Sequence, residues 1–384
     1  MFAFTSLSKK QSKNDHMIRI LQVVSNMDRA GIETMLMNYY RHIDRNRIQF
    51  DFLCNKLKPG DYDEEIIQMG GRIFHTPGLN PFKYGAYLKY MDQLFQEHSE
   101  YKIVHAHNDA FVVYSLYAAK RNHVPVRIAH VHCSAFGWDY KLPLKWVCRP
   151  LIKPIASHLW ACGMVAGEFF YGKGTPFHVH NNAIEVNRYV YNEAARQRIR
   201  RMNNLGDGIV IGHIGRFVWQ KNHRFLIDIF SHIYQLSPQA HLVLLGVGDG
   251  IQAIQAYVRE KGLEHVVHFM HGVNNVNEWC SAFDCFIMPS LSEGMPVVGI
   301  EAQTADLPCI FSDSITREVD ILPSTCFLSL KQSPEIWAEK ALQLIREKGV
   351  RQDRSQEITQ AGFNIEIETV KLMEMYERMY NLSR

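Results

Sequence analysis

The sequence predicts an α/β protein built from two doubly wound, Rossmann-like domains that face each other across a cleft. Short apolar runs alternate with amphipathic helical patterns along most of the chain, which is typical of βαβ units in parallel sheets. A polar break at about residues 181–208 divides this alternation into two halves. Because doubly wound sheets bind ligands beyond the carboxyl ends of their strands, we expect the functional site between the two halves.

The first half, residues 17–185, begins with a continuous apolar run at 18–25, as expected of a strand that is buried on both faces. A turn and an amphipathic helix at 32–43 follow it. Further strands are predicted at 49–55, 72–76, 103–107, 127–132 and 158–162. Residues 1–16 are polar and lack the apolar segment of a signal peptide, so they are predicted to form a disordered tail.

The second half, residues 186–364, opens with a basic helix at 194–202 and a polar, hinge-like segment at 203–208. Its strands are predicted at 209–215, 241–246, 267–271, 285–290, 309–311 and 325–328. A final amphipathic helix is predicted at 365–380 within the last segment, residues 365–384. Its stripe of Met and Tyr residues indicates packing against a core.

The composition is that of a globular protein of about two domains. The chain has 384 residues, 47% of them hydrophobic and 21% charged. A net charge of +3 is too small to indicate nucleic-acid binding. The eight cysteines form no CxxC pair and are predicted to be reduced core residues of a cytoplasmic protein. No apolar run approaches the roughly 20 residues of a membrane-spanning helix.

The segment from Met288 to Glu301 is the clearest candidate site. It predicts the end of a strand, a turn at 292–294 and a helix that opens at Pro296, where proline suits the first helical position. Free N–H groups at the start of that helix favour an anion. Glu293 and Glu301 flank the same place, and carboxylates accept hydrogen bonds from hydroxyls. The segment therefore suits a ligand that carries both phosphate and sugar hydroxyls, although such glutamates are also common on solvated surfaces.

Two cations follow the first strand of the second half. Arg216 and Lys221 lie in the loop after Gly215, which we expect beside Glu293. A solvated basic turn is the alternative interpretation. Losing one partner of a desolvated charge pair costs about 2–5 kcal/mol, whereas a helix terminus contributes about 0.3–1 kcal/mol. We therefore expect the cations to dominate the binding of a diphosphate and the helix N-terminus to steer it.

Glycines mark two further strand-to-helix loops. Gly31 lies in the loop 27–33 before the first helix and could let that backbone touch a diphosphate. The run 246–250 begins like GxGxxG but lacks the third glycine at the required spacing, so it is weak evidence for a dinucleotide. It is interpreted as a tight turn that lets a nucleotide base approach the backbone.

Histidines end two strands of the first half, at 105, 107, 130 and 132. His132 is a candidate for lining the active site, and His130 and His107 are weaker ones. A metal site is not predicted, because we expect the imidazoles to lie on opposite faces of each strand, without a carboxylate partner.

Two other motifs have both a functional and a structural interpretation. Asp61 and Asp63 resemble the metal-binding DxD of another transferase architecture, but they follow Pro59-Gly60 and are predicted to cap a helix. The segment 138–153 mixes aromatic, aliphatic and basic residues, which is typical of peripheral contact with anionic lipid. A packed surface helix is the other possibility for this segment.

Together these motifs resemble the retaining glycosyltransferases of GT-B fold, in particular the large nucleotide-sugar-dependent group of bacterial polysaccharide synthesis. The resemblance covers nearly the whole chain after residue 17. Its strongest match is the pair Glu293 and Glu301, separated by seven residues, after a strand that ends in Pro-Ser. Next come Gly215-Arg216 with Lys221-Asn222, and then Gly31-Ile-Glu33, where Ala30 replaces a second glycine that is common in the family.

The resemblance implies a GT-B architecture with an acceptor domain at 17–185, a donor domain at 186–364 and a last helix, 365–384, that crosses back to the acceptor domain. It also implies roles for single residues. Glu301 would bind the ribose hydroxyls, Glu293 would hold the donor sugar, and His132 would lie near that sugar and the β-phosphate. Arg216 and Lys221 would stabilise the departing diphosphate without a metal. Further donor contacts would come from the backbone at Gly31, Gly215, Gly294, Met295 and Val297.

The implied activity is transfer of a hexose or N-acetylhexosamine from a nucleotide sugar to a saccharide or a polyprenyl-diphosphate-linked saccharide. UDP is the expected nucleotide on family frequency, and no metal or other cofactor is expected. The product would be a capsular polysaccharide, an exopolysaccharide or another cell-surface glycan, made in the cytoplasm or at the inner face of the membrane. Three alternatives remain open: a sugar-nucleotide 2-epimerase, a nicotinamide-dependent oxidoreductase and a non-catalytic nucleotide-sugar-binding protein.

Overall fold

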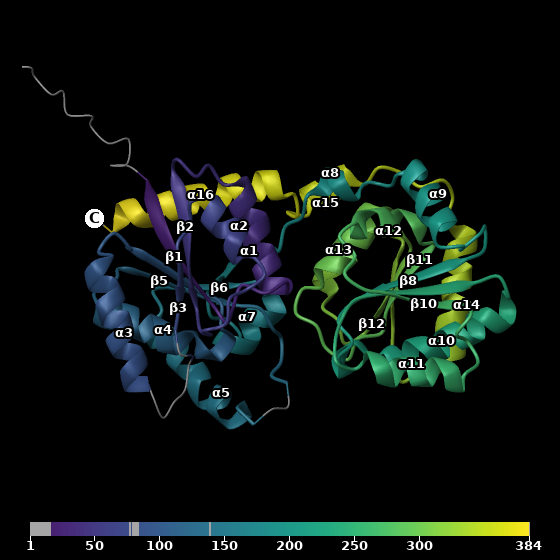
Figure 1. The fold of residues 1–384 in the computed structure, drawn as a ribbon, viewed down its shortest axis with the longest axis horizontal. Helices are drawn as coiled ribbons and strands as arrows, with labels where there is room; N and C mark the ends of the chain where they lie inside the picture. The colour runs from purple at the N-terminus through teal and green to yellow at the C-terminus, as the bar shows by residue number, and fades with distance from the viewer. Residues whose placement is uncertain (1–16, 77, 79–83, 138–139, 384) are drawn as a thin grey trace, which may run out of the picture.

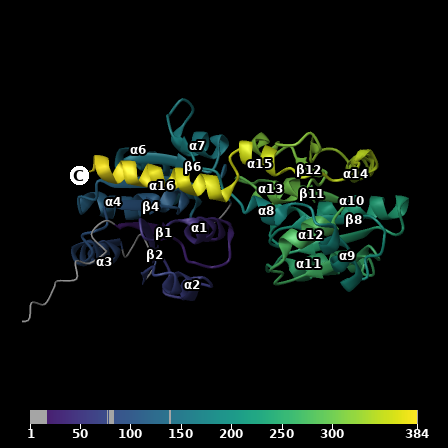
Figure 2. The same ribbon diagram turned by 90° about the horizontal axis from the view of Figure 1, so that it is seen from above.

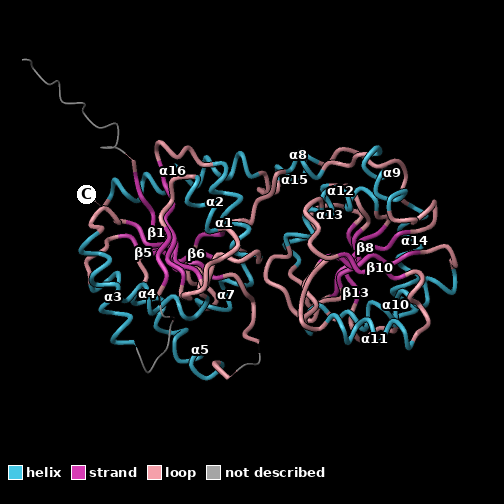
Figure 3. Tube along the Cα trace, viewed as in Figure 1, coloured by secondary structure: helices cyan, strands magenta, loops and turns pink. Residues whose placement is uncertain are grey.

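The protein consists of two α/β domains that lie side by side (Figure 1). The computed structural model describes residues 17–76, 78, 84–137 and 140–383, so the predicted tail at 1–16 lies outside the described residues. In each domain the strands form a central parallel sheet with helices around it (Figure 3). The strand orders are β3-β2-β1-β4-β5-β6-β7 and β10-β9-β8-β11-β12-β13, as expected of doubly wound sheets.

Apolar runs determine the strands of both sheets. The first sheet contains β1 (Ile18–Val24), β2 (Ile48–Cys54), β3 (Ile73–His75), β4 (Ile103–Ala106), β5 (Val126–Val131), β6 (His158–Ala161) and β7 (His178–Val179). The second contains β8 (Val210–Ile214), β9 (His241–Leu245), β10 (Val267–Met270), β11 (Cys285–Met288), β12 (Cys309–Ser312) and β13 (Thr325–Leu328). Every strand predicted from the sequence is present. Only β7 was not predicted, because a strand of two residues has no periodicity to detect.

Helices cover the faces of each sheet. In the first domain they are α1 (Gly31–His42), α2 (Asp63–Gln68), α3 (Tyr84–Glu97), α4 (Val112–Arg121), α5 (Leu142–Cys148), α6 (Ile152–Ile155) and α7 (Met164–Tyr171), with 3-10 turns η2 (Asp109–Phe111) and η3 (Arg149–Leu151). In the second they are α9 (Glu193–Met202), α10 (His223–Leu236), α11 (Ile251–Glu260), α12 (Val276–Ala282), α13 (Val297–Thr304) and α14 (Pro334–Glu347), with η4 (Trp219–Lys221) and η5 (Arg317–Val319). The short helices α8 (Val186–Tyr189) and α15 (Ser355–Gln360) lie where the chain passes between the domains.

The last helix, α16 (Ile365–Leu382), crosses back and lies along the first domain (Figure 2). Leu372, Met373 and Tyr376 are buried in the same apolar core as β1, β2 and α1. The predicted stripe of Met and Tyr residues is therefore core packing, and it joins the end of the chain to its beginning.

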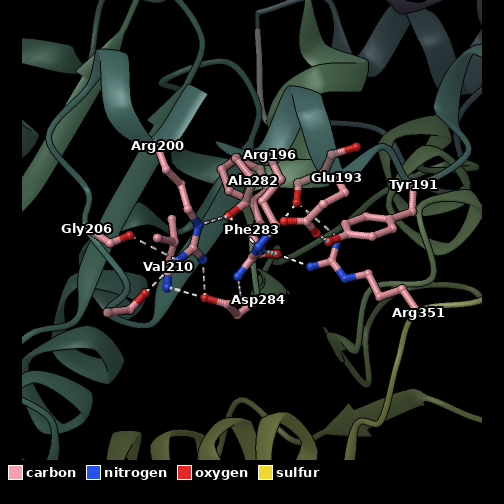
Figure 4. A network of polar contacts seen from close by, with 12 residues as sticks. Tyr191, Glu193, Arg196, Arg200, Gly206, Val210, Ala282, Phe283, Asp284 and Arg351 are labelled. Carbon is pink, nitrogen blue, oxygen red and sulfur yellow. Dashed lines mark hydrogen bonds and ion pairs between the residues drawn. The ribbon is translucent and has the colours of Figure 1, made fainter. Parts of the chain in front are cut away.

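The basic helix α9 packs one face on the second domain. Arg196 and Arg200 form ion pairs with Asp284, at 2.6 and 2.5 Å, and the backbone N–H of Val210 donates to the same carboxylate (Figure 4). Arg351 donates to the backbone carbonyls at the end of α12, including that of Phe283. Burial lowers the pKa of Arg351 to about 10. The positive charge of this segment therefore anchors the linker to β8 and β11.

Two expectations from composition can be compared with the described residues. All eight cysteines are free thiols, and six of them are buried. Among the described helices, none has the length and the apolar content needed to cross a membrane.

Candidate active site

The carboxyl end of β11 is held against the neighbouring loop of its own domain. The backbone N–H of Leu291 donates to the carbonyl of Gln220 (2.7 Å), and the Asn222 side-chain amide donates to the carbonyl of Pro289 (3.2 Å). Asn222 has φ 54°, a left-handed conformation that asparagine tolerates. These contacts bring the loop that carries Lys221 beside the turn that carries Glu293.

Helix α13 begins one residue later than predicted. Pro296 is the N-cap residue with an extended ψ of 92°, and Val297 is the first helical residue. The prediction that Pro296 opens the helix is therefore wrong by one position. Proline lacks a backbone N–H and fits both the N-cap and the first helical position. The sequence pattern therefore could not distinguish these two positions. Val297 and the preceding turn still lie at the N-terminus of this helix, as the anion-site hypothesis requires.

Lys221 and Glu293 form an ion pair with Nζ and Oε1 2.7 Å apart, and both side chains are mostly buried. Gly215 makes room for this arrangement, because a Cβ there would lie 3.1 Å from Cε of Lys221. Arg216 follows in the same loop and is exposed. The predicted cation and the predicted sugar-binding carboxylate thus meet in the structure.

Glu301 lies on α13 and is hydrogen bonded to the Tyr189 hydroxyl of α8. Burial raises the pKa of Glu301 to about 7, against the opposing effects of Tyr189 and the Arg188 guanidinium. This carboxyl group is therefore poised between its neutral and charged forms near neutral pH.

The two domains touch at this site. The Ser134 hydroxyl of the first domain donates to the backbone carbonyl of Glu293 at 2.6 Å. Gly294 lies so close to the end of β5 that a Cβ there would be 2.3 Å from the carbonyl oxygen of His132. The predicted site residues of the first and second domains are thus brought together across the interface.

Glu33 lies in the first turn of α1. It is mostly buried, and burial raises its pKa to about 7, while the charge of Arg216 acts in the opposite direction. Helix α1 begins at Gly31. Among the described residues, no neighbouring heavy atom lies within 4 Å of the place that a Cβ at Gly31 would occupy. A ligand could therefore approach this helix N-terminus closely.

Asp61 and Asp63 do not cap α2 as predicted. The N-cap residue of α2 is Tyr62, and its side chain accepts no capping hydrogen bond. Asp61 instead accepts from the backbone N–H of Arg29 (2.9 Å), and Asp63 accepts from that of Gly60 (3.0 Å). The tertiary contact to Arg29 takes Asp61 away from the helix and holds the loop before Gly31, whereas Asp63 makes a local contact to Gly60 and a tertiary one to His75 (3.1 Å).

The four strand-end histidines form a cluster in which His105, His107 and His130 are buried. Nitrogen atoms of His105, His107 and His130 lie within 4.8 Å of one another, so the described residues include one group with the composition of a metal site. The expectation that the imidazoles lie on opposite strand faces is wrong, because side chains at positions i and i+2 share a face. These rings are instead linked by hydrogen bonds, including His105 to His130 (3.1 Å) and His107 to His132 (3.0 Å). Metal independence stays a prediction.

The glycine run 246–250 packs on protein backbone. A Cβ at Gly246 would lie 2.0 Å from the carbonyl oxygen of Gly215, and those at Gly248 and Gly250 would meet backbone atoms of Phe217. The Cβ positions of these glycines are therefore occupied by the neighbouring loop, and a nucleotide base could not approach from this side. Met295 is also engaged within the protein, because its backbone is hydrogen bonded to the Cys162 thiol.

Comparison with known proteins identifies the family of the chain. The chain matches the family model described as glycosyl transferases group 1 over residues 208–347, and that of glycosyltransferase family 4 over residues 29–188. It is 37% identical over 336 residues to a protein of Bacillus subtilis (strain 168) named as the glycosyltransferase EpsF, covering 85% of this chain and 87% of EpsF. The chain belongs to the family 4 glycosyltransferases.

Two more distant relatives and one solved structure extend the comparison. The capsular polysaccharide biosynthesis glycosyltransferase CapH of Staphylococcus aureus is 23% identical over 376 residues, 94% of this chain and 99% of CapH. An Escherichia coli UDP-Gal:α-D-GlcNAc-diphosphoundecaprenol α-1,3-galactosyltransferase is 23% identical over 304 residues, 74% of this chain and 76% of that enzyme. The structure of Anabaena HepE in complex with UDP-glucose shares the fold, with a TM-score of 0.76 at 17% identity over 94% of this chain and 99% of HepE.

As a family 4 glycosyltransferase, the protein is a retaining enzyme with the GT-B fold that uses a nucleotide-sugar donor. Family membership decides between the interpretations that the sequence left open, against the epimerase, the oxidoreductase and the non-catalytic protein. The sequence did not point to Tyr189 or Ser134. No motif marks these residues, because each contact joins segments far apart in the chain.

Proposed function

We propose that this family 4 glycosyltransferase moves a hexose or N-acetylhexosamine from a UDP-sugar to a polyprenyl-diphosphate-linked saccharide during synthesis of a capsular or other extracellular polysaccharide. The UDP-glucose in the HepE structure supports the choice of donor. The name of the E. coli relative supports a lipid-linked acceptor, and that of CapH supports a polysaccharide product.

The observation that carries the proposal is the Lys221–Glu293 ion pair at the N-terminus of α13, directly across the interface from His132. Without donor, Glu293 neutralises Lys221. When a UDP-sugar binds, its diphosphate takes the place of the carboxylate as the partner of Lys221. Glu293 is then free to accept hydrogen bonds from the hydroxyls of the sugar.

The remaining groups complete the donor site. Glu301 accepts hydrogen bonds from the ribose, with Tyr189 holding its carboxyl group in place. Arg216 joins Lys221 on the diphosphate, and the backbone at Gly294, Met295 and Val297 contributes the N-terminal end of α13. Two cations and a helix dipole can balance the charge of a departing UDP, so this chemistry needs no metal. The leaving phosphate oxygen takes the proton of the acceptor hydroxyl on the face where the new bond forms.

A thermal-shift series in excess EDTA tests the donor site, with UDP, GDP, ADP, UDP-glucose and NAD as ligands. UDP at 100 times its dissociation constant should add about 2.7 kcal/mol of stability and raise the melting temperature by a few degrees. This rise should survive EDTA and disappear in Arg216→Ala. Stabilisation by NAD alone, or a UDP effect that requires a divalent metal, would refute the proposed site.

Substitutions of the ion pair should separate binding from turnover. Lys221→Ala removes a cation and leaves Glu293 unpaired beside the diphosphate, so UDP affinity should fall by about 2–5 kcal/mol. Glu293→Ala frees Lys221, so UDP affinity should be kept while turnover of UDP-glucose falls. Calorimetric titration with UDP and assay of UDP-glucose hydrolysis measure the two effects. Lys261→Ala, at an exposed pair with Asp228 in the same domain, is the control. Equal losses of UDP affinity in both site variants would contradict the assigned roles.

We also propose that the first domain contacts an anionic membrane through the face formed by α5, η3 and α6. Trp146, Val147 and Leu151 are 49%, 62% and 46% exposed on this face. Arg149 lies over the Trp146 ring, 5.2 Å from its centroid, and Lys153 is exposed. Residues 138 and 139 of the predicted segment 138–153 lie outside the described residues. Exposed apolar and basic groups together are typical of interfacial binding, and a lipid-linked acceptor would be reached at such a surface.

Co-sedimentation tests this contact with vesicles of phosphatidylglycerol and of phosphatidylcholine. Binding should require phosphatidylglycerol and weaken with added salt, because the electrostatic part is screened. Val147→Ser should reduce the partition constant for the vesicles at least about tenfold, since burial of a valine side chain contributes about 1.5–3 kcal/mol. Leu236→Ser is a matched control, because Leu236 is 64% exposed on α10 of the other domain. Equal binding to both lipids at low salt would exclude the proposed contact with an anionic membrane.

A further inference from the structure

A continuous line of hydrogen bonds runs from the last helix to the candidate active site. The Gln22 side-chain amide of β1 donates to the Tyr376 hydroxyl of α16 at 3.3 Å, and its oxygen lies 2.9 Å from Nε2 of His107. Nδ1 of His107 lies 3.0 Å from Nε2 of His132. Gln22, His107 and Tyr376 are buried, so water does not compete for these contacts.

The order of donors along this line is determined by Gln22. Its amide oxygen can only accept, so Nε2 of His107 carries the proton of that hydrogen bond. Burial lowers the pKa of His107 well below its usual range and that of His132 to about 3, so both imidazoles are neutral. A neutral His107 with a protonated Nε2 has a bare Nδ1, which accepts. Nε2 of His132 must then be the donor, and Nδ1 of His132 carries no proton.

The other branch of the cluster agrees with the same order. The Tyr376 oxygen accepts from Gln22, so the Tyr376 proton is free to donate to Nδ1 of His105, 2.6 Å away. Nε2 of His105 then donates to Nδ1 of His130 at 3.1 Å. With the Gln22 amide in this orientation, the Tyr376 hydroxyl accepts from one branch and donates to the other.

We infer that Gln22, oriented by Tyr376 and acting through His107, fixes His132 in the tautomer whose Nδ1 carries no proton. Nδ1 of His132 is buried and has no hydrogen-bond partner among the described residues, whereas Nε2 of the same ring is occupied by His107. A bare Nδ1 can accept a hydrogen bond from a hydroxyl of the donor or acceptor sugar. Gln22, His107 and Tyr376 are positioning residues. The inference rests on the proposed role of His132 near the donor sugar.

Through Tyr376, helix α16 would influence which nitrogen of His132 carries the proton. Tyr376 belongs to the core that joins α16 to β1, β2 and α1, and its hydroxyl is where the line of hydrogen bonds starts. The helix that crosses back to the first domain thus contributes to the protonation pattern of the site as well as to folding.

The tautomer of His132 can be measured directly. In ¹H–¹⁵N spectra of the full chain labelled with ¹⁵N-histidine, the His132 ring should show a proton on Nε2 and none on Nδ1, with the signals assigned by their loss in His132→Gln. Gln22→Leu removes the acceptor of His107, so His132 should then show a mixture of both tautomers. Gln22→Glu keeps an acceptor-only oxygen at that place, so the wild-type signals should return.

The kcat of the variants should fall when His132 loses its single tautomer. With UDP-glucose hydrolysis as the assay, kcat should fall about tenfold in Gln22→Leu and recover in Gln22→Glu, while KM and the Kd of UDP change less than twofold. This loss lies below the 10²–10⁴-fold that a positioned acid–base group typically contributes. Tyr39→Phe is the matched control, because it removes a hydroxyl of the same core that bonds to the Asn181 carbonyl and not to this line.

Tyr376→Phe, which removes a single oxygen atom, serves as the second variant if Gln22→Leu does not fold, with the same expected changes. A proton on Nδ1 of His132 in the wild type would overturn the inference, and so would an unchanged His132 spectrum in both Gln22→Leu and Tyr376→Phe. Full turnover in His132→Ala would instead remove the proposed role of His132, on which the inference rests.

Discussion

Glu301 is a carboxyl group whose state should change close to neutral pH. Burial raises its pKa from 4.5 to about 7, so the folded protein holds this proton more tightly than the unfolded chain does. The stability that comes from the protonated form is fully present below about pH 4.5 and is lost as the pH rises through 7. When Glu301 is ionised, its hydrogen bond with Tyr189 only partly offsets the cost of burying the charge.

Glu301→Gln should therefore stabilise the free enzyme at pH 8 and have much less effect at pH 5. A shift of this size corresponds to at most about 3 kcal/mol. Thermal melts at the two pH values measure the difference, and Glu339→Gln, on the exposed face of α14, is the control. A variant as stable as the wild type at pH 8 would mean that Glu301 is ionised without penalty in the folded protein.

Residues of the site differ in how far the sequence could identify them. Glu293 and Glu301 could be named because both lie in one strand-turn-helix segment with a fixed spacing. Lys221 could be placed near them because neighbouring parallel strands end at the same edge. Tyr189 and Ser134 reach the site from other segments, and their positions depend on how the domains pack. The histidine cluster was misjudged because the face shared by His105 and His107 was assigned incorrectly.

The segment that joins the two halves is more firmly held than its polar sequence suggests. Helix α9 contributes two arginines to one carboxylate, and Asp284 also accepts from the start of β8 (Figure 4). Arg200 is almost completely buried. Buried cations without a partner are expensive, so this carboxylate should matter more for stability than any exposed ion pair.

Asp284→Asn should lower the free energy of unfolding by about 3–5 kcal/mol, because it leaves Arg196 and Arg200 without a negative charge. Glu377→Gln at the more exposed pair with Arg47 should cost less than about 1 kcal/mol. Urea unfolding of both variants measures the two effects side by side. Similar losses in the two variants would show that the Asp284 pairs are solvated in solution.

Strands were predicted better than helix ends, and the reason is physical. A strand buried on both faces needs an uninterrupted apolar run, which is visible in the sequence. A helix end depends on which side chains reach the first N–H groups, and tertiary contacts can take those side chains away. Asp61 shows this, since it accepts from the backbone N–H of Arg29 instead of capping α2.

Several polar contacts connect the two domains at the site. Besides the Ser134 hydroxyl, the Glu318 carboxylate of the second domain accepts from the backbone N–H of Met164, at the N-terminus of α7 (2.6 Å). Arg29 donates to the Asn274 side chain at 3.3 Å. The proposed nucleotide contacts lie within the second domain, whereas His132 belongs to the first. A change in the contact between the domains should therefore leave the binding of UDP largely intact. The same change should impair transfer of the sugar.

Gly294→Ala tests this division of labour. A Cβ at Gly294 would lie 2.3 Å from the backbone carbonyl oxygen of His132, so the two domains must move apart to accommodate it. The Kd of UDP should change less than about threefold, because the nucleotide site stays within one domain, while kcat should fall about 100-fold, as expected for a misplacement of about 1 Å. Small-angle scattering should show a larger radius of gyration than in the wild type. Gly85→Ala is the control, because its Cβ would meet nothing within 4 Å in the first domain. Retention of full turnover in Gly294→Ala would mean that transfer does not need His132 to approach the N-terminus of α13 this closely.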